Sequence, residues 1–140
     1  MNQPTRITGG CLCGSVEYTA SAQPMATVVC HCKDCQKYSG TAFAAVIFVP
    51  KDHVEIVGEL NGYESETDAG NVMTRTFCPN CGTHITENST GFPDVVVLTA
   101  GTLNDPGWLK PSAQCFAGRK LPWAYLSDAI PQYDGMPPMG

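Results

Sequence analysis

Apolar and polar residues follow a short-period pattern along most of the chain. Residues 15–20 and 53–57 alternate with a period of two, which is typical of strands with one buried face. Residues 41–49 and 95–100 are almost continuously apolar and rich in β-branched side chains, which predicts two buried strands. Further short strands are predicted at residues 26–29, 60–64, 72–77, 83–87 and 113–117.

Turns rich in glycine and proline separate these strands. Gly9-Gly10 is predicted to be a turn, and residues 65–71 are predicted to be the tip of a hairpin. Residues 34–39 could form one or two helical turns that end at Gly40. We therefore predict a fold that is mostly β, with short antiparallel strands and little helix.

The composition is that of a globular protein, and the length allows a single domain over residues 1–140. The net charge is -5 and the eight lysines and arginines are scattered, whereas a nucleic-acid-binding face needs clustered basic residues. Residues 1–6 are polar, and no apolar stretch approaches the roughly 20 residues of a membrane-spanning helix. We therefore expect a soluble, cytoplasmic protein that binds neither nucleic acid nor membranes.

Seven of the eight cysteines fall into three tight clusters. The clusters are Cys11 and Cys13, then Cys30, Cys32 and Cys35, then Cys78 and Cys81. In a reducing cytoplasm, closely spaced cysteines indicate metal ligation or catalysis rather than a disulfide framework. We predict zinc as the bound metal, with disulfides or an iron–sulfur centre as the alternatives.

The first and last clusters have the form of zinc knuckles, in which one tight turn supplies two thiolates. The knuckles are Cys11-x-Cys13 and Cys78-x-x-Cys81, and a glycine directly follows each of them. Glycine permits the positive φ that lets backbone amides turn towards the sulfurs. Two such knuckles complete one tetrahedral site, so we predict a structural zinc on four thiolates. The alternative is two unrelated pairs of buried thiols.

The middle cluster, Cys30, Cys32 and Cys35, has no knuckle to complete it. A structural zinc usually takes four protein ligands, whereas a catalytic zinc keeps one position for water or substrate. The central question is therefore whether a fourth ligand closes this site. The candidates for that ligand are Cys115, His31, His53, His84, a carboxylate or solvent.

Each protein candidate for the fourth ligand also has a plainer interpretation. His31 lies between two proposed ligands, so we expect its side chain to point away from the metal, where it would support the site or pack. We expect His84 to be a strand residue near the structural zinc and His53 to be a solvated surface residue. Cys115 stands alone, and a buried free cysteine commonly behaves as a small hydrophobe.

An open fourth position favours a thiol as the substrate. Zinc deprotonates a coordinated thiol, and a centre with three thiolates is better suited to presenting a thiolate than to activating water. A thiolate that attacks an aldehyde gives a hemithioacetal, and a nearby acid would protonate the developing alkoxide. The local polar candidates, each of which could equally be an ordinary solvated or capping side chain, are Lys33, Lys37, Tyr38 and Ser39.

Three ordered motifs are similar to those of a known family. Residues 10–18 (Gly-Cys-Leu-Cys-Gly-Ser-Val-Glu-Tyr) resemble its opening motif, and residues 30–35, followed by residues 39–43, resemble its second. Residues 77–83 (Phe-Cys-Pro-Asn-Cys-Gly-Thr) resemble its third. Over most of its length the chain thus resembles the glutathione-dependent formaldehyde-activating enzyme family, which shares its domain with centromere protein V.

This resemblance implies a zinc-stapled β-tent fold with two zinc ions per chain. The structural zinc would be held by Cys11, Cys13, Cys78 and Cys81. The second zinc would be held by the catalytic thiolates of Cys30, Cys32 and Cys35. The implied activity joins glutathione to formaldehyde as S-hydroxymethylglutathione, which is a carbon–sulfur lyase reaction in the reverse direction. The thiol's carboxylates would be contacted by Lys33, Lys37, Arg119 or Lys120.

One departure from the family pattern concerns position 114. Members commonly carry a histidine near the last strand in a Pro-x-x-His pattern, whereas here Pro111 leads to Gln114. This change removes one polar group that the resemblance would place near the substrate.

Two other functions are compatible with the sequence. The first is a non-enzymatic, two-zinc binding or scaffold domain in which both metals are structural. The second is a redox or metal sensor whose thiols release zinc on oxidation. The sequence leaves the natural aldehyde, the natural thiol and the oligomeric state open, a homo-oligomer included.

Overall fold

The computed structural model describes residues 4–137 of the protein, so the first three residues of the polar N-terminal stretch lie outside it. Its ten strands are β1 (Ile7–Gly10), β2 (Glu17–Ala20), β3 (Ala26–Cys30), β4 (Ala44–Pro50), β5 (Val54–Val57), β6 (Asn61–Glu66), β7 (Val72–Phe77), β8 (His84–Ser89), β9 (Val95–Thr99) and β10 (Ala113–Cys115). The α-helix α1 covers Lys33–Ser39, and 3-10 turns cover Lys51–His53, Ala100–Thr102 and Ala117–Arg119. The prediction of a mostly β fold is therefore confirmed.

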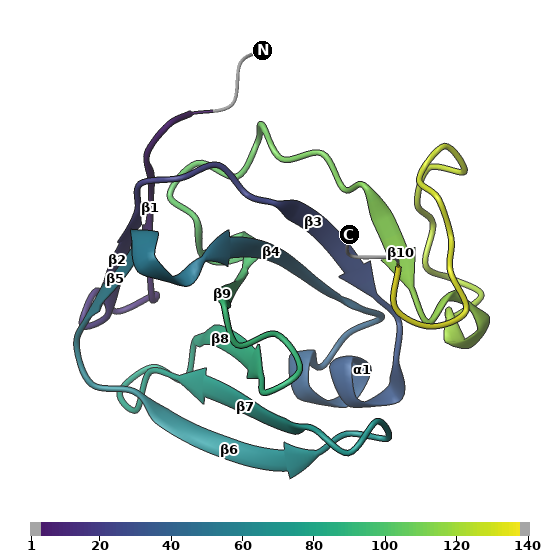
Figure 1. Ribbon diagram of the computed structural model, residues 1–140, viewed down its shortest axis with the longest axis horizontal. Coiled ribbons are helices and arrows are strands. Elements are labelled where there is room, and N and C mark those ends of the chain that lie inside the picture. The colour runs from purple at the N-terminus through teal and green to yellow at the C-terminus, as the bar shows by residue number, and fades with distance from the viewer. Residues whose placement is uncertain (1–3, 138–140) are drawn as a thin grey trace.

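The strands form two sheets. One has three antiparallel strands in the order β1-β2-β5, and the other has seven strands in the order β10-β3-β4-β9-β8-β7-β6. All pairs in the larger sheet are antiparallel except β10 and β3, which run parallel. Helix α1 lies between the β3–β4 part and the β6–β8 part of this sheet (Figure 1). Within residues 4–137, no helix is long and apolar enough to cross a membrane.

The position of strand β4 between two core clusters explains why its sequence is almost continuously apolar. Successive side chains of a strand point to opposite faces of its sheet. Ile47 and Val49 are buried in one core cluster, whereas Val46 and Phe48 are buried in another. Both faces of β4 are thus covered, and the buried strand predicted at residues 41–49 is confirmed, although it begins at Ala44 and ends at Pro50.

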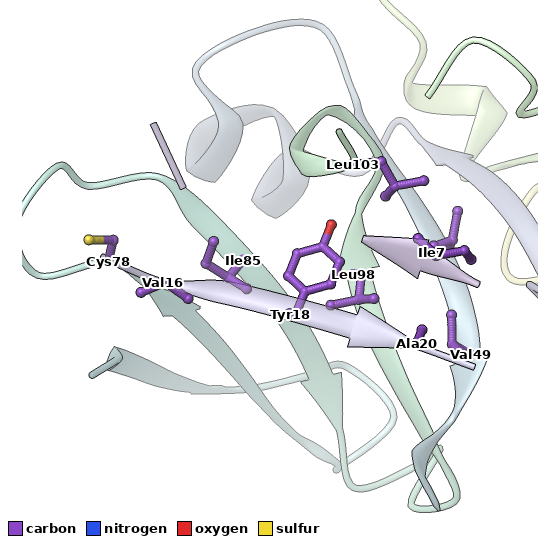
Figure 2. Close-up of a cluster of buried hydrophobic side chains, with 10 residues drawn as sticks. Ile7, Val16, Tyr18, Ala20, Val49, Cys78, Ile85, Leu98 and Leu103 are labelled. Atoms are coloured by element: carbon purple, nitrogen blue, oxygen red, sulfur yellow. The ribbon is translucent and has the colours of Figure 1, made fainter. Parts of the chain in front are cut away.

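The first core cluster lies between the two sheets (Figure 2). Its buried members are Ile7, Val16, Tyr18, Ala20, Ile47, Val49, Cys78, Ile85, Leu98 and Leu103. Burying each valine, leucine or isoleucine of this cluster stabilises the fold by about 1.5–3 kcal/mol, so the cluster is the main attachment of the small sheet to the large one. Cys78 belongs to it, which anchors one proposed zinc ligand in the core.

The second core cluster lies on the other face of the larger sheet. Its buried members are Val28, Val46, Phe48, Val97, Ala113 and Cys115. Cys30 packs against this cluster, as do Phe116 and Tyr133. Each cysteine group is therefore attached to a different core.

The predicted turn at Gly9-Gly10 is wrong, because both residues end strand β1 and pair with β2. The glycines serve close packing rather than a turn. A Cβ atom on Gly9 would collide with the Tyr18 ring, and one on Gly10 would lie 2.5 Å from the Val16 carbonyl oxygen. Glycine at a strand position can therefore mark the close approach of a neighbouring group, which the sequence pattern alone does not distinguish from a turn.

Candidate metal centres

The first candidate centre joins two turns that are far apart in the sequence. Cys11 and Cys13 follow β1, whereas Cys78 and Cys81 follow β7, and their four Sγ atoms all lie within 4.8 Å of one another. The separation is 3.6 Å between the sulfurs of Cys11 and Cys13, and 3.8 Å between those of Cys13 and Cys78. Sulfurs arranged tetrahedrally at the usual zinc distance would be about 3.8 Å apart, so this geometry fits zinc.

Glycines in the left-handed conformation close both turns. The φ angle is 84° at Gly14 and 80° at Gly82, a region that side chains with a Cβ atom avoid. The Gly82 amide donates to the Cys78 carbonyl at 2.8 Å, and the Gly14 amide donates to the Cys11 carbonyl at 3.2 Å. The positive φ predicted from the sequence is therefore present at both positions.

Backbone and side-chain donors surround the four sulfurs. The Val16 amide donates to Cys11 Sγ at 3.2 Å, and the Asn80 side chain donates to Cys13 Sγ at 3.2 Å. The Ser15 hydroxyl lies 2.7 Å from Cys13 Sγ and lowers the pKa of that thiol to about 7, while Thr83 lowers the pKa of Cys81 to about 5. These contacts favour the thiolate form that a metal needs.

The second candidate centre forms where β3 passes into α1. Cys30 ends the strand, Cys32 is the N-cap of the helix, and Cys35 lies in its first turn. Their three Sγ atoms lie within 4.8 Å of one another, and the Cys35 amide donates to Cys32 Sγ at 3.3 Å. Hydrogen bonds from Cys30 and then Cys35 lower the pKa of the Cys32 thiol. The donor set fits zinc with three protein ligands.

No fourth cysteine, histidine, aspartate or glutamate joins these three sulfurs within residues 4–137. His53 is exposed, as predicted, and its Nδ1 lies 3.2 Å from the Ser21 hydroxyl. His84 lies on strand β8, but its ring stacks on Tyr38 of α1 at a centroid distance of 4.0 Å. It therefore faces the helix that carries Cys35.

His31, which lies between Cys30 and Cys32 in the sequence, is fully buried. Its ring contacts Gln114 and Phe43. Nε2 lies 2.8 Å from Oε1 of Gln114, which is also fully buried, and the ring packs edge-on against Phe43. The interpretation of His31 as a packing or supporting residue thus agrees with its contacts. Gln114, which follows Pro111 by three residues, is its hydrogen-bond partner.

Cys115 lies beside Cys30 because strands β10 and β3 pair with these two residues in register. It is buried in the second core cluster, and its thiol raises the pKa of Cys30. The Cys115 sulfur nevertheless falls outside the group of three mutually close sulfurs. Cys115 is thus a neighbour of the second centre, one strand away.

The sequence did not indicate a polar cluster beside the second centre. Arg75 on β7 and Glu87 on β8 are both buried, and Arg75 Nε lies 3.3 Å from Glu87 Oε1. The Arg75 guanidinium lies 5.3 Å from the centre of the Tyr38 ring. Burial raises the pKa of Glu87, although Arg75 acts in the opposite direction. Twelve residues separate Arg75 from Glu87, and only the hairpin register brings them together.

Two cavities flank Tyr38. One, of about 360 Å³, is mainly apolar and reaches Phe43, His84 and Glu87. The other, of about 370 Å³, lies between α1 and strands β6 and β7, and reaches Tyr63 and Arg75. A small substrate beside α1 would therefore have room on either side of the Tyr38 ring.

The other polar residues predicted near the second centre differ in how freely they can act. Lys33 and Lys37 are exposed on α1. The Ser39 hydroxyl is committed to the backbone, because it donates to the Cys35 carbonyl at 2.7 Å. Arg119 is exposed, and its carbonyl accepts a hydrogen bond from the Gln36 side chain on α1 at 3.1 Å.

Comparison with known proteins gives a consistent family match. Residues 6–119 match the profile of the family described as "Glutathione-dependent formaldehyde-activating enzyme". Two fungal relatives with the same provisional name come from Podospora anserina (30% identical over 112 residues) and Penicillium rubens (29% over 113 residues). These matches cover 76% and 77% of the chain but 52% and 57% of the relatives, so the chain spans about half their length.

A solved structure supports the fold independently. The crystal structure of a Rhodobacter sphaeroides protein matches 74% of the chain and 91% of its own, with a TM-score of 0.56 and 19% identity. At this identity the likeness concerns the arrangement of the strands and says nothing about activity.

Proposed function

The chain belongs to the glutathione-dependent formaldehyde-activating enzyme family, and on that premise we propose that it is a zinc-dependent carbon–sulfur lyase acting on a thiol–aldehyde adduct. In the direction of synthesis, the reverse of the lyase reaction, glutathione and formaldehyde combine to give S-hydroxymethylglutathione. The names of the family and of the two fungal relatives suggest these substrates.

The observation that carries this proposal is the incompleteness of the second centre. Cys30, Cys32 and Cys35 converge, while no fourth ligand joins them within residues 4–137. The first centre, formed by Cys11, Cys13, Cys78 and Cys81, has all four. We therefore propose two zinc ions per chain, a structural one on the four cysteines and a working one on the three.

Each part of the second centre has a role in this proposal. Zinc bound there would supply an open position at which a small thiol loses its proton. Cys30, Cys32 and Cys35 hold that centre at the start of α1, and the rigid strand β3 fixes their approach. The new carbon–sulfur bond forms as the carbonyl electrons move to oxygen, which then takes up a proton. The reverse sequence cleaves the adduct.

The carboxylates of glutathione need positive charge close to this centre. Lys33 and Lys37 are exposed on α1, the helix that carries Cys35. Arg119 is also exposed, at the end of the 3-10 turn Ala117–Arg119, and its carbonyl accepts a hydrogen bond from Gln36 on α1. Arg-carboxylate and Lys-carboxylate contacts are the usual means of binding such groups. We place the reaction in the cytoplasm, where the glutathione pool keeps thiols reduced.

Titration of the zinc-loaded protein with glutathione tests this proposal. Metal–sulfur coordination is followed by X-ray absorption, and product formation from formaldehyde is followed by NMR. We expect a fourth sulfur to join the second centre at millimolar glutathione and the hydroxymethyl product to accumulate faster than without protein. An unchanged coordination sphere together with an unchanged rate would contradict the proposal.

A second candidate function is a scaffold in which both metals are structural. The position of Cys115 beside Cys30 favours it, because a small shift of β10 could bring a fourth thiol to the second centre. In that case Cys115→Ser would lower the affinity of the second zinc, and glutathione would not change its coordination. Under the lyase proposal, Cys115→Ser leaves zinc stoichiometry at two.

A further inference from the structure

We propose that Tyr38 is a catalytic residue that donates a hydrogen bond, and then a proton, to the oxygen of the thiol–aldehyde adduct. This inference rests on the proposed lyase function and adds the acid that the reaction needs. It assigns Arg75 and His84 as positioning residues, because they act by holding the Tyr38 ring.

The helix places Tyr38 one turn from a proposed zinc ligand. Side chains three residues apart on an α-helix are neighbours on the same face, with Cβ atoms roughly 5–6 Å apart. Tyr38 follows Cys35 by three residues on α1, so it lies on the face that carries this buried thiol. It also borders both of the cavities beside the helix.

Contacts within the fold do not explain why the Tyr38 hydroxyl is buried. Its oxygen is buried and has no hydrogen-bond partner in the part of the chain that the structure describes. An unsatisfied buried polar group costs about 1–3 kcal/mol, and most buried hydroxyls in folded proteins are paired. A partner that comes with the substrate would account for both the burial and the missing bond.

The Tyr38 ring is fixed by contacts other than its hydroxyl. The His84 ring stacks on it with the two centroids 4.0 Å apart, and the Arg75 guanidinium lies 5.3 Å from its centroid. Arg75 is itself held, because its Nη1 donates to the Ser65 hydroxyl and its Nε to Glu87, both at 3.3 Å. The hydroxyl is thus presented by a rigid support and left free to donate.

Burial also sets the protonation state of this hydroxyl. Burial and then the Glu87 carboxylate raise the pKa of Tyr38, so it carries its proton at neutral pH. The other candidates are less suitable: the Ser39 hydroxyl donates to backbone carbonyls, and Lys33 and Lys37 are exposed to solvent.

The proposed step balances in atoms and electrons. The ionised thiol sulfur donates an electron pair to the carbonyl carbon, and the carbonyl π electrons move to oxygen. The Tyr38 hydroxyl gives its proton to this oxygen, and the proton first released by the thiol returns to the phenolate through solvent. The sum is thiol plus aldehyde giving the hydroxyalkyl thioether, with no oxidant or reductant. In the lyase direction each step reverses: Tyr38 first gives its proton through solvent to the departing thiolate, and its oxygen takes the hydroxyl proton of the adduct as the carbon–sulfur bond breaks.

Tyr38→Phe is the variant that tests this inference, because it keeps the ring and its stacking. We expect kcat to fall roughly 100-fold, in the range of general acid catalysis, while KM for glutathione and zinc content stay unchanged. Tyr125→Phe is the matched control, since Tyr125 is 90% exposed and borders neither cavity, and we expect wild-type activity from it.

A binding measurement provides a readout without turnover. Calorimetry compares S-(2-hydroxyethyl)glutathione with S-ethylglutathione, which lacks the hydroxyl. We expect Tyr38→Phe to weaken binding of the first compound about tenfold, the value of one net hydrogen bond, and to leave the second unchanged. The Tm of the variant should equal or exceed that of the wild type, because the substitution removes an unpaired buried hydroxyl.

The outcomes separate the two proposals. If the wild type turns over and Tyr38→Phe matches it in kcat, or both ligands weaken equally, Tyr38 only packs and the inference is wrong. A lower Tm for Tyr38→Phe would also overturn it, because the hydroxyl would then have a structural partner. If the wild type shows neither turnover nor thiol coordination, the lyase proposal itself is wrong and the role of Tyr38 falls with it.

Discussion

The two cysteine centres use the same ligand chemistry but gather their ligands in opposite ways. In the first, 65 residues separate Cys13 from Cys78, and Cys78 is fully buried in the core between the sheets. In the second, all three thiols fall within the six residues Cys30–Cys35. A metal at the first centre ties distant parts of the fold together. A metal at the second holds only a strand end to a helix start, beside two cavities.

The comparison predicts that loss of a ligand from the first centre is the most damaging change in the molecule. Cys78→Ser removes a buried thiol that belongs to both the core and the metal site. Structural zinc contributes on the order of 10 kcal/mol to the folding of small domains, so we expect a loss of at least about 3 kcal/mol. For a chain of this size, that lowers Tm by roughly 10 °C, as measured by calorimetry.

Cys35→Ser is the matched variant at the second centre. We expect it to abolish turnover and the second zinc, with a smaller fall in Tm than Cys78→Ser. The reverse ranking, with Cys35→Ser the less stable protein, would show that the second centre is the structural one. The scaffold hypothesis would then be favoured.

Stepwise removal of metal is the next sharpest test. A site with three protein ligands and an open position should release zinc before one with four. We expect a chelator titration to take zinc from two to one per chain with full loss of activity, while far-ultraviolet circular dichroism stays unchanged. Glutathione added first should slow this release. Simultaneous loss of both ions and of the fold would remove the distinction between the centres.

A smaller effect is expected at the polar cluster behind α1. Burial raises the pKa of Glu87 above its ordinary value of 4.5, so the folded state binds this proton more tightly than the unfolded state. The stabilisation is therefore full below pH 4.5 and is lost as the pH rises through the raised pKa. In Glu87→Gln this pH dependence should disappear, while Gln can still accept from Arg75. Urea unfolding at several pH values measures the difference, and equal slopes in both proteins would contradict it.

The smallest predicted effect concerns His31 and Gln114. Gln114→Leu removes the partner of His31 Nε2 in a fully buried site, so we expect a loss of about 1–3 kcal/mol. The double variant His31→Phe/Gln114→Leu replaces both polar partners and should recover much of that loss. Equilibrium unfolding of Gln114→Leu, His31→Phe and the double variant gives the coupling free energy. Additive losses would show that the bond contributes little to stability.

Local patterns predicted the strands and both cysteine groups because their information lies within a few residues. The turn-rich residues 65–71 locate the start of β7 and Gly40 locates the end of α1, and the spacing of the cysteines separates four thiols from three. The turn prediction at Gly9 was wrong because glycine is required there by the Tyr18 ring, which belongs to a neighbouring strand. A local pattern does not contain that contact.

The cluster around Tyr38 could not be predicted for a related reason. Arg75 and Glu87 meet only in the β7–β8 register, which shifts between Thr76 and Phe77. His84 reaches Tyr38 only because α1 lies over these strands. Both facts depend on tertiary packing, so nothing in the spacing of these residues would have revealed them.

The unequal chain separation of the ligands has a consequence for the order in which a growing chain acquires metal. Closing a 65-residue loop costs roughly 2 kcal/mol more than closing one of about five residues, from the logarithmic dependence of closure entropy on length. The local thiols Cys30–Cys35 also emerge from the ribosome before Cys78 and Cys81. A nascent chain would therefore bind its first metal ion at the second centre, before the four cysteines of the first centre can come together.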